Sequence, residues 1–174
     1  MLTEAEPNPA HLALAELERL GLVQAIVTQN IDLLHERAGS REVVEVHGSI
    51  RTATCPGCGA RYELEQVLAL LAEAAAPACP ACGEIVKPDV VFFGELLPPE
   101  AIDRAYKLAR AAALMLVVGS ALEVYPIAGL PEETLAAGGK LAIVNRGPTP
   151  YDGRANLRID GIAGEVLPAV VAAL

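Results

Sequence analysis

The sequence predicts an α/β fold, a doubly wound and mostly parallel Rossmann-like sheet that carries a small inserted zinc-ribbon module. Short apolar runs alternate with helical patterns on both sides of the chain's centre, which is typical of parallel strands covered on both faces. The chain's four cysteines form two C-x-x-C pairs near its middle. We therefore expect one domain made of residues 1–49 and 88–174, interrupted by a zinc-binding module at residues 50–87.

Caps and apolar runs mark the elements before the module. Asn8 is a good N-cap, Pro9 suits the first helical position and Gly21 suits the position after the helix ends. A buried strand, a short helix and a second strand are expected next, at residues 23–28, 32–38 and 43–46.

The module and the second half of the chain follow the same logic. A helix at 64–75 is expected between the two cysteine pairs, and the β/α alternation is expected to resume with a strand at 90–93. The remaining expected elements are a helix from Pro99 to about Ala112, a strand at 114–118, a helix ending near Gly138, strands at 141–144 and 157–159, and a closing helix at 165–174.

Composition and charge narrow the class of protein. Apolar residues make up 53% of the 174 residues, and no stretch of them is long enough to cross a bilayer. The N-terminus lacks the basic and apolar regions of a signal peptide, so we expect a cytoplasmic protein that does not bind membranes. The net charge of −9 argues against nucleic acid as a direct partner and would tolerate a basic peptide.

The cysteine pairs are the strongest motif, Cys55-Pro-Gly-Cys58 and Cys79-Pro-Ala-Cys82, with 20 residues between them. Each pair supplies two thiolates from one turn, so two pairs complete the tetrahedral shell of one Zn²⁺ ion. Two disulfides or one redox-active pair are the alternatives, and disulfides fit poorly without an export signal. Because four protein ligands leave no open position, we expect a structural zinc and chemistry elsewhere.

Polar residues gather where the predicted strands end. They occupy 28–32 after the first strand, His47-Gly48 after the second, 119–121 after the fourth and Asn145 after the fifth. A doubly wound sheet binds ligands at the carboxyl ends of its strands, and this set suits a ligand with ribose hydroxyls. His47 is the best candidate for a general base. Taken singly, each of these residues is more often structural: a helix cap, a turn residue or a structural histidine.

In their order and spacing, these segments resemble the sirtuin family of NAD-dependent protein deacylases, over essentially the whole chain. The resemblance rests on Thr28-Gln29-Asn30-Ile31-Asp32, Leu34-His35, Ala38-Gly39-Ser40, Glu45-Val46-His47-Gly48, the cysteine quartet, the run from Lys87 to Glu95, Val118-Gly119-Ser120, Val124-Tyr125-Pro126, Ile143-Val144-Asn145 and the run from Ala163 to Pro168.

The resemblance implies that the protein removes an acyl group from a lysine side chain, consumes NAD and releases nicotinamide and O-acetyl-ADP-ribose. His47 would be the base that activates a ribose hydroxyl, and Asn30 and Asp32 would line the nicotinamide and ribose pocket as further catalytic residues. The other expected cofactor-binding residues are Gln29, Ile31, Gly119, Ser120, Ala121, Asn145, Arg146, Gly147 and Ala163.

The same resemblance implies a protein or peptide substrate that carries an acyl-lysine. Val90, Val91, Phe92 and Gly94 would form the tunnel and the edge strand to which the peptide adds by main-chain hydrogen bonds. A neutral acyl-lysine enters an apolar tunnel at less desolvation cost than a charged lysine.

Two departures from the family pattern affect these expectations. Ala121 lacks the hydroxyl that the family usually has there, which would weaken contact with NAD. The family's N-terminal strand, its Gly-Ala-Gly loop and a following Asp-Phe-Arg element have no counterpart in these residues. We therefore expect most of a deacylase that is inactive or weak as this chain, with a sheet that lacks a strand beside residues 23–28.

Two other functions remain as alternatives. The chain could be a non-catalytic, zinc-stabilised binding or assembly module that forms a homodimer through exposed sheet edges. A zinc-ribbon nucleic-acid module is the third reading, and the acidic residues of the insert disfavour it.

Overall fold

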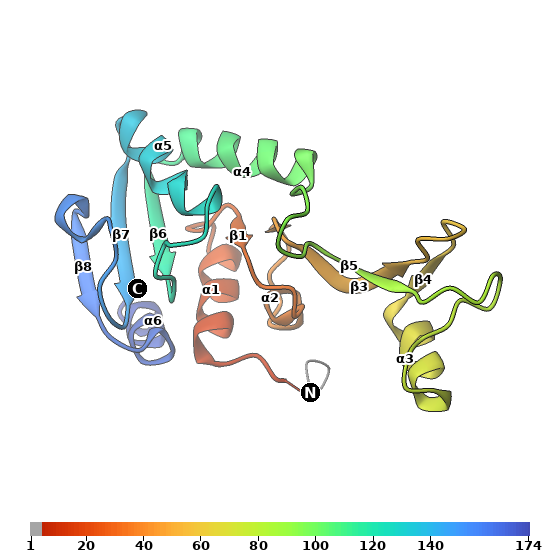
Figure 1. Ribbon diagram of the computed structural model, residues 1–174. Helices are drawn as coiled ribbons and strands as arrows, with labels where there is room; N and C mark the ends of the chain where they lie inside the picture. The colour runs from red at the N-terminus through yellow and green to blue at the C-terminus, as the bar shows by residue number, and fades with distance from the viewer. Residues whose placement is uncertain (1–4) are drawn as a thin grey trace.

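The computed structural model describes residues 5–174 and shows an α/β body from which a smaller β-rich part extends (Figure 1). The strands of the body are β1 (Ile26–Thr28), β2 (Val43–Glu45), β6 (Leu114–Val118), β7 (Lys140–Asn145) and β8 (Leu157–Asp160). Its helices are α1 (Pro9–Arg19), α2 (Leu34–Arg37), α4 (Pro99–Ala111), α5 (Leu130–Ala136) and α6 (Ala163–Ala172), with 3-10 turns at Ile127–Gly129 and Asp152–Arg154. The extension contains β3 (Gly48–Thr54), β4 (Arg61–Glu63), α3 (Leu64–Glu73) and β5 (Lys87–Val90).

The strands of the body run parallel, as predicted, but they form two sheets. β1 pairs with β2, and β6, β7 and β8 pair in that order. Within residues 5–174, no ladder joins β1 to β6, so each of these strands has one edge without a strand partner.

Helices cover both faces of these sheets, which confirms the doubly wound arrangement. On one face, α1 and α6 pack against Ile26 and Val144 through Leu14, Leu17 and Leu167. On the other face, α4 and α5 cover β2 and β6. Their contacts form a cluster of Val44, Val46, Ala105, Ala109 and Leu130, packed with Val27 and Met115. Because one helix layer contacts β1 and β7 together, the two sheets share a core.

The start of α1 confirms how the caps were read. The Asn8 side chain accepts hydrogen bonds from the N–H groups of Ala10 and His11, at 2.9 and 3.2 Å. The side chain of His11 in turn accepts from the Asn8 N–H, which completes a capping box. The strand expected at 23–28 is shorter than predicted, since β1 comprises only its last three residues.

The β-rich extension, residues 48–90, is called the zinc module below. β3 is its central strand and pairs antiparallel with both β4 and β5. Gly48 lies opposite Val90 and Thr54 lies opposite Lys87. β3 begins before residue 50 and β5 ends after residue 87, so the module's sheet extends past both ends of the 50–87 range. The domain limits drawn from the sequence stay a prediction.

The strand predicted at 90–93 is wrong. β5 ends at Val90 and belongs to the antiparallel sheet of the zinc module, and residues 91–98 form an irregular loop. Phe93 in that loop is fully exposed, at 102%. The apolar run therefore lines a surface instead of filling a core, which the hydrophobic pattern alone could not distinguish. Among the residues that the structure describes, no helix is long and apolar enough to cross a membrane.

Candidate active site and metal centre

A cavity of about 920 Å³ lies between the α/β body and the loop that follows β5. Many of the residues predicted for catalysis, cofactor binding and substrate binding line it: Gln29, Asn30, Ile31, Asp32, His47, Val90, Val91, Phe92 and Gly94. These residues come from three separate stretches of the chain, so the fold brings together what the sequence pattern only suggested.

His47 sits at the junction between the body and the zinc module, directly after β2 and before β3. Its Nδ1 lies 3.2 Å from the carbonyl oxygen of Gln29. A carbonyl can only accept, so a hydrogen bond at this contact requires the tautomer in which Nδ1 donates and Nε2 accepts. Gly48 lets the chain turn here, because its φ is +72° and a Cβ would lie 2.1 Å from the Asp89 carbonyl oxygen.

The residues after β1 combine a local structural role with a place in the cavity. The Asn30 N–H donates to Thr28 Oγ1 at 3.1 Å, and Asp32 Oδ1 accepts from the Leu34 N–H at 3.1 Å. Asp32 therefore helps to start α2. Leu33, not Asp32, is the N-cap residue of α2. Asp32 also lines the cavity, and its catalytic role stays a prediction.

The cavity also has lining residues that the sequence analysis did not assign to the site. They are Phe93, Glu95, Leu96, Leu97, Ile102, Val124, Tyr125 and Pro126. Leu96 and Tyr125 are 93% and 69% exposed. The apolar residues around Gly94 were a sequence signal for the part of the wall that residues 93–97 form. No signal in the sequence indicated that residues 124–126 lie beside that segment.

The other predicted cofactor-binding residues form a second group and do not line this cavity. Gly119, Ser120 and Ala121 follow β6, Asn145, Arg146 and Gly147 follow β7, and Ala163 begins α6. Asn145 is buried and its side-chain amide donates to the Gly147 carbonyl at 3.1 Å. Residues 119–121 and 145–147 thus lie at the carboxyl ends of two adjacent parallel strands, whereas Ala163 lies at the start of the helix after β8.

One residue missed by the sequence analysis holds this second group in shape. Arg158 in β8 donates to the carbonyl oxygens of Asn145 and Gly147, at 2.9 and 2.5 Å, and to Asp152 at 2.9 Å. Its side chain is 19% exposed. An arginine in a short strand gives no sequence signal of such contacts, because its partners depend on the pairing of β7 with β8.

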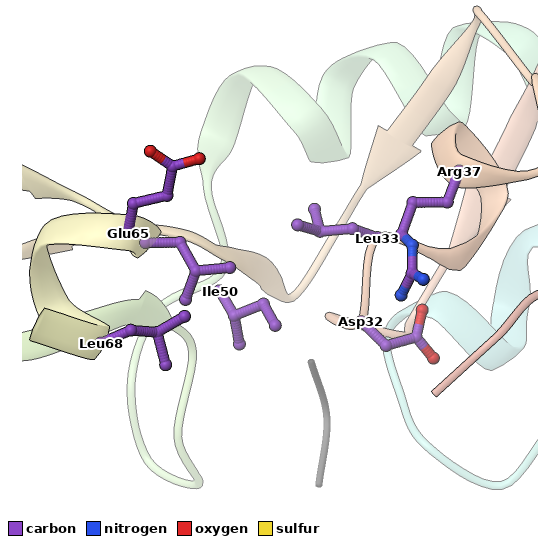
Figure 2. A pocket seen from close by; sticks show the side chains of 7 residues that line it. Asp32, Leu33, Arg37, Ile50, Glu65 and Leu68 are labelled. Carbon is purple, nitrogen blue, oxygen red and sulfur yellow. The ribbon is translucent and has the colours of Figure 1, made fainter. Parts of the chain in front are cut away.

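A smaller cavity of about 210 Å³ lies between α2 and α3. Figure 2 shows Ile50 and Leu68 on one side of it and Asp32 and Arg37 on the other. Leu33, another of its lining residues, has a φ of +63°. Asp32 lines both cavities.

The cysteines form a metal centre from two loops of the zinc module, one between β3 and β4 and one between α3 and β5. The sulfur atoms of Cys55, Cys58, Cys79 and Cys82 all lie within 4.8 Å of one another, and none of the four is in a disulfide. Tetrahedral Zn–S bonds of about 2.3 Å need sulfur atoms just under about 4 Å apart. The four residues therefore fit one structural zinc ion, as predicted.

A tyrosine supports this centre. The hydroxyl of Tyr62 lies 3.0 Å from the Sγ of Cys79. That hydrogen bond is the main cause that lowers the pKa of the Cys79 thiol to about 6, which favours the thiolate that zinc requires. Groups that hydrogen-bond to ligand atoms commonly orient them.

Comparison with known proteins agrees with the resemblance seen in the sequence. The Sir2 family model matches residues 1–126. The chain is 48% identical over 166 residues to NAD-dependent protein deacetylase 1 of Pyrobaculum aerophilum, a match that covers 95% of this chain and 65% of the relative. It is 47% identical to the NAD-dependent protein deacetylase of Thermotoga maritima over 90% of this chain and 64% of that protein. The chain thus spans just under two thirds of these relatives.

Solved structures match closely as well. A structure described as "Sir2-p53 peptide-NAD+" superimposes with a TM-score of 0.94 at 44% identity, covering 99% of this chain and 72% of that one. Another, "Sir2 bound to acetylated peptide", gives the same score, identity and coverage. The Sir2 family model matches more than half of this chain, so the chain belongs to the Sir2 family.

Proposed function

We propose that the chain carries the catalytic centre of an NAD-dependent protein lysine deacylase, which releases nicotinamide and O-acetyl-ADP-ribose. The observation that carries the proposal is His47, which lines the large cavity with Nδ1 engaged by a backbone carbonyl. The similar proteins named as NAD-dependent deacetylases support the same reaction class.

His47 acts as the general base in this proposal. With its Nδ1 proton directed to the Gln29 carbonyl, the ring accepts a proton from a ribose hydroxyl at Nε2. Bound NAD would supply an electrophilic ribose carbon, which would bond to the acyl oxygen as its bond to nicotinamide breaks. Asn30 and Asp32 line the same cavity and orient the nicotinamide and ribose as further catalytic residues, with Gln29 and Ile31 beside them.

The group after β6 and β7 would hold the rest of the dinucleotide. A Cβ at Gly119 would meet nothing within 4 Å and the residue has a φ of +59°, so a ligand can approach its backbone closely. Ser120, Ala121, Asn145, Arg146, Gly147 and Ala163 complete the proposed contacts to phosphate, ribose and adenine. The Ser120 hydroxyl already accepts from the Leu122 N–H at 3.2 Å, which fixes its place in the turn.

The acyl-lysine enters between the loop after β5 and the base. Val90, Val91, Phe92 and Gly94 line the cavity and are proposed to receive the peptide. β5 ends at Val90, so the peptide would add to an irregular loop instead of the regular edge strand expected from the sequence.

The four thiols point to a reducing compartment, and we place the protein in the cytoplasm.

The first test is peptide binding, because the chain spans only 64–65% of the curated relatives. A fluorescent acetyl-lysine peptide should bind at least about tenfold more tightly than its unacetylated twin. The second test is turnover with NAD after extension of the chain to the relatives' length. His47→Ala should lower kcat at least about 100-fold and leave peptide affinity unchanged. Equal affinity for both peptides would refute the proposal.

A second candidate function is assembly through the open sheet edges. β1 and β6 each have an edge without a strand partner within residues 5–174, and such edges can pair with another chain. We propose homodimer formation through these edges as the alternative for the 174-residue chain. Sedimentation equilibrium decides the matter, since a monomer at high protein concentration would rule the dimer out.

A further inference from the structure

The loop after β5, residues 91–98, is held at its base by an ion pair between Lys87 and Glu95. Lys87 Nζ lies 3.0 Å from Glu95 Oε2, and the two side chains are 38% and 42% exposed. An exposed pair of this kind contributes little to stability by itself. The importance of the pair lies in the backbone groups that it contacts.

Both side chains hydrogen-bond to the main chain at the start of the loop. Lys87 Nζ donates to the Val90 carbonyl at 2.9 Å and lies 4.6 Å from the ring centroid of Phe92. Glu95 Oε2 accepts from the Phe92 N–H at 2.9 Å. The same bond, reinforced by Lys87, holds the pKa of Glu95 below its usual value, so the carboxylate is charged at neutral pH.

These contacts connect the loop to the base. The Val91 N–H donates to the His47 carbonyl at 2.9 Å. The backbone groups of Val90, Val91 and Phe92 are thus fixed in turn by Lys87, His47 and Glu95. The N–H groups of Phe93 and Gly94, by contrast, have no backbone partner within residues 5–174.

We propose that Lys87 and Glu95 are positioning residues, which hold the loop in the shape that receives the acyl-lysine peptide. Neither needs to touch the reacting atoms. They satisfy the inner main-chain groups of the loop and leave the outer ones free for the main chain of a peptide. The inference rests on the proposed function, since it assigns the loop to the substrate of that reaction.

Substitution of Glu95 tests the proposal on the 174-residue chain. Glu95→Ala removes the acceptor for the Phe92 N–H and should weaken acetyl-lysine peptide binding about tenfold. Glu95→Gln keeps an acceptor oxygen without charge and should weaken it only about threefold. Glu42→Gln, which disrupts the ion pair with Arg104 on the body, is the matched control and should bind like the parent. Zinc content and Tm confirm that each variant is folded.

A charge exchange separates positioning from simple attraction. In the double variant Lys87→Glu with Glu95→Lys, the two charges still meet, but residue 95 can no longer accept from the Phe92 N–H. The proposal expects peptide binding to stay weak, by about tenfold as in Glu95→Ala. Recovery to the parent affinity would show that only the charge pair matters and would overturn it.

Amide hydrogen exchange tests the loop without any peptide, so a failed binding assay does not obscure the result. In Glu95→Ala, the Phe92 amide should exchange at least about tenfold faster, whereas the Ile143 amide in β7 should not change. Unchanged exchange at Phe92 would overturn the inference even if the protein binds peptide. If the parent binds the acetylated and unacetylated peptides equally, the proposed function fails. Faster exchange at Phe92 in Glu95→Ala would then still support the role of Lys87 and Glu95 in holding the loop.

Discussion

The zinc module and the α/β body are stabilised in different ways. In the body, three clusters of buried apolar residues include Leu141, Ile143 and Leu167, each exposed by 1% or less. The module's buried cluster has four members, Ala53, Cys55, Cys79 and Val86, and two of them are metal ligands.

The helices show the same difference. α1 contributes four buried residues to the core, whereas α3 has none, although most of its residues are apolar. We expect burial to stabilise the body without help from the metal, as in other domains of this size. The module depends on bonds to zinc, since structural zinc contributes about 10–16 kcal/mol of binding free energy in small zinc domains. One chain therefore contains a part whose stability follows apolar burial and a part whose stability follows metal.

Removal of zinc is the strongest way to test this comparison. Cys79→Ala, or extraction of the metal with a chelator, should abolish amide protection in β3, β4 and β5 because the module has almost no apolar core. β6 and β7 should remain protected. Glu65→Gln, on the surface of α3, is the control and should keep full zinc content. Protection of the whole module without metal would contradict the comparison.

Loss of apolar side-chain volume should destabilise the body more than the zinc module. Leu141 is 0% exposed in the body, and Leu141→Ala should lower the free energy of unfolding by about 2–5 kcal/mol. Leu68 on α3 is 40% exposed, and Leu68→Ala should cost less than about 1 kcal/mol. Urea denaturation of both zinc-loaded variants measures the difference. Equal costs would mean that the module has a core of its own.

The junction between the two regions has a steric test. Gly48→Ala places a Cβ 2.1 Å from the Asp89 carbonyl oxygen at a φ of +72°, so β3 and β5 must separate locally. We expect a loss of about 2–3 kcal/mol in stability. Gly59→Ala is the matched control, with a φ of +76° and no atom within 4 Å. It should cost only about 1 kcal/mol. Similar losses in both variants would leave backbone strain as the cause.

The smallest effect concerns acid pH and the contact of α1 with α2. Burial, and then the neighbouring His11 ring, lower the pKa of His35 from 6.5, against the opposing effect of Asp32 and Glu36. A histidine with a lowered pKa stabilises the fold above pH 6.5 and loses that contribution as the pH falls below it. Between pH 7.5 and 5.5, the Tm of the parent should fall by about 2 °C more than that of His35→Gln. Parallel falls would exclude His35 as the cause.

The sequence predicted those features that have a local signal. Asn8 and Pro9 identified the start of α1, and the spacing of the cysteines identified the zinc centre. The strand at 114–118 was predicted at its observed bounds, because an apolar run ends at a glycine there.

Features that depend on contacts between distant segments could not be predicted. The pairing of β3 with β5 decides that the run after Val90 is a loop. Similarly, the contacts of Arg158 with Asn145 and Gly147 exist only because β8 pairs with β7. In the site, His47 and Asn30 could be identified as candidates, but the wall formed by residues 124–126 could not.

The pairing of Gly48 with Val90 means that the chain leaves the α/β body and returns to it at one place. An insert whose two ends are neighbours can be exchanged for another without moving the elements that carry it. The zinc module can therefore be treated as a replaceable cassette, and a chimera that joins a different zinc ribbon at this pair of residues should still fold. The limit on such grafting is the hydrogen bond from Val91 to His47, which any replacement must leave intact.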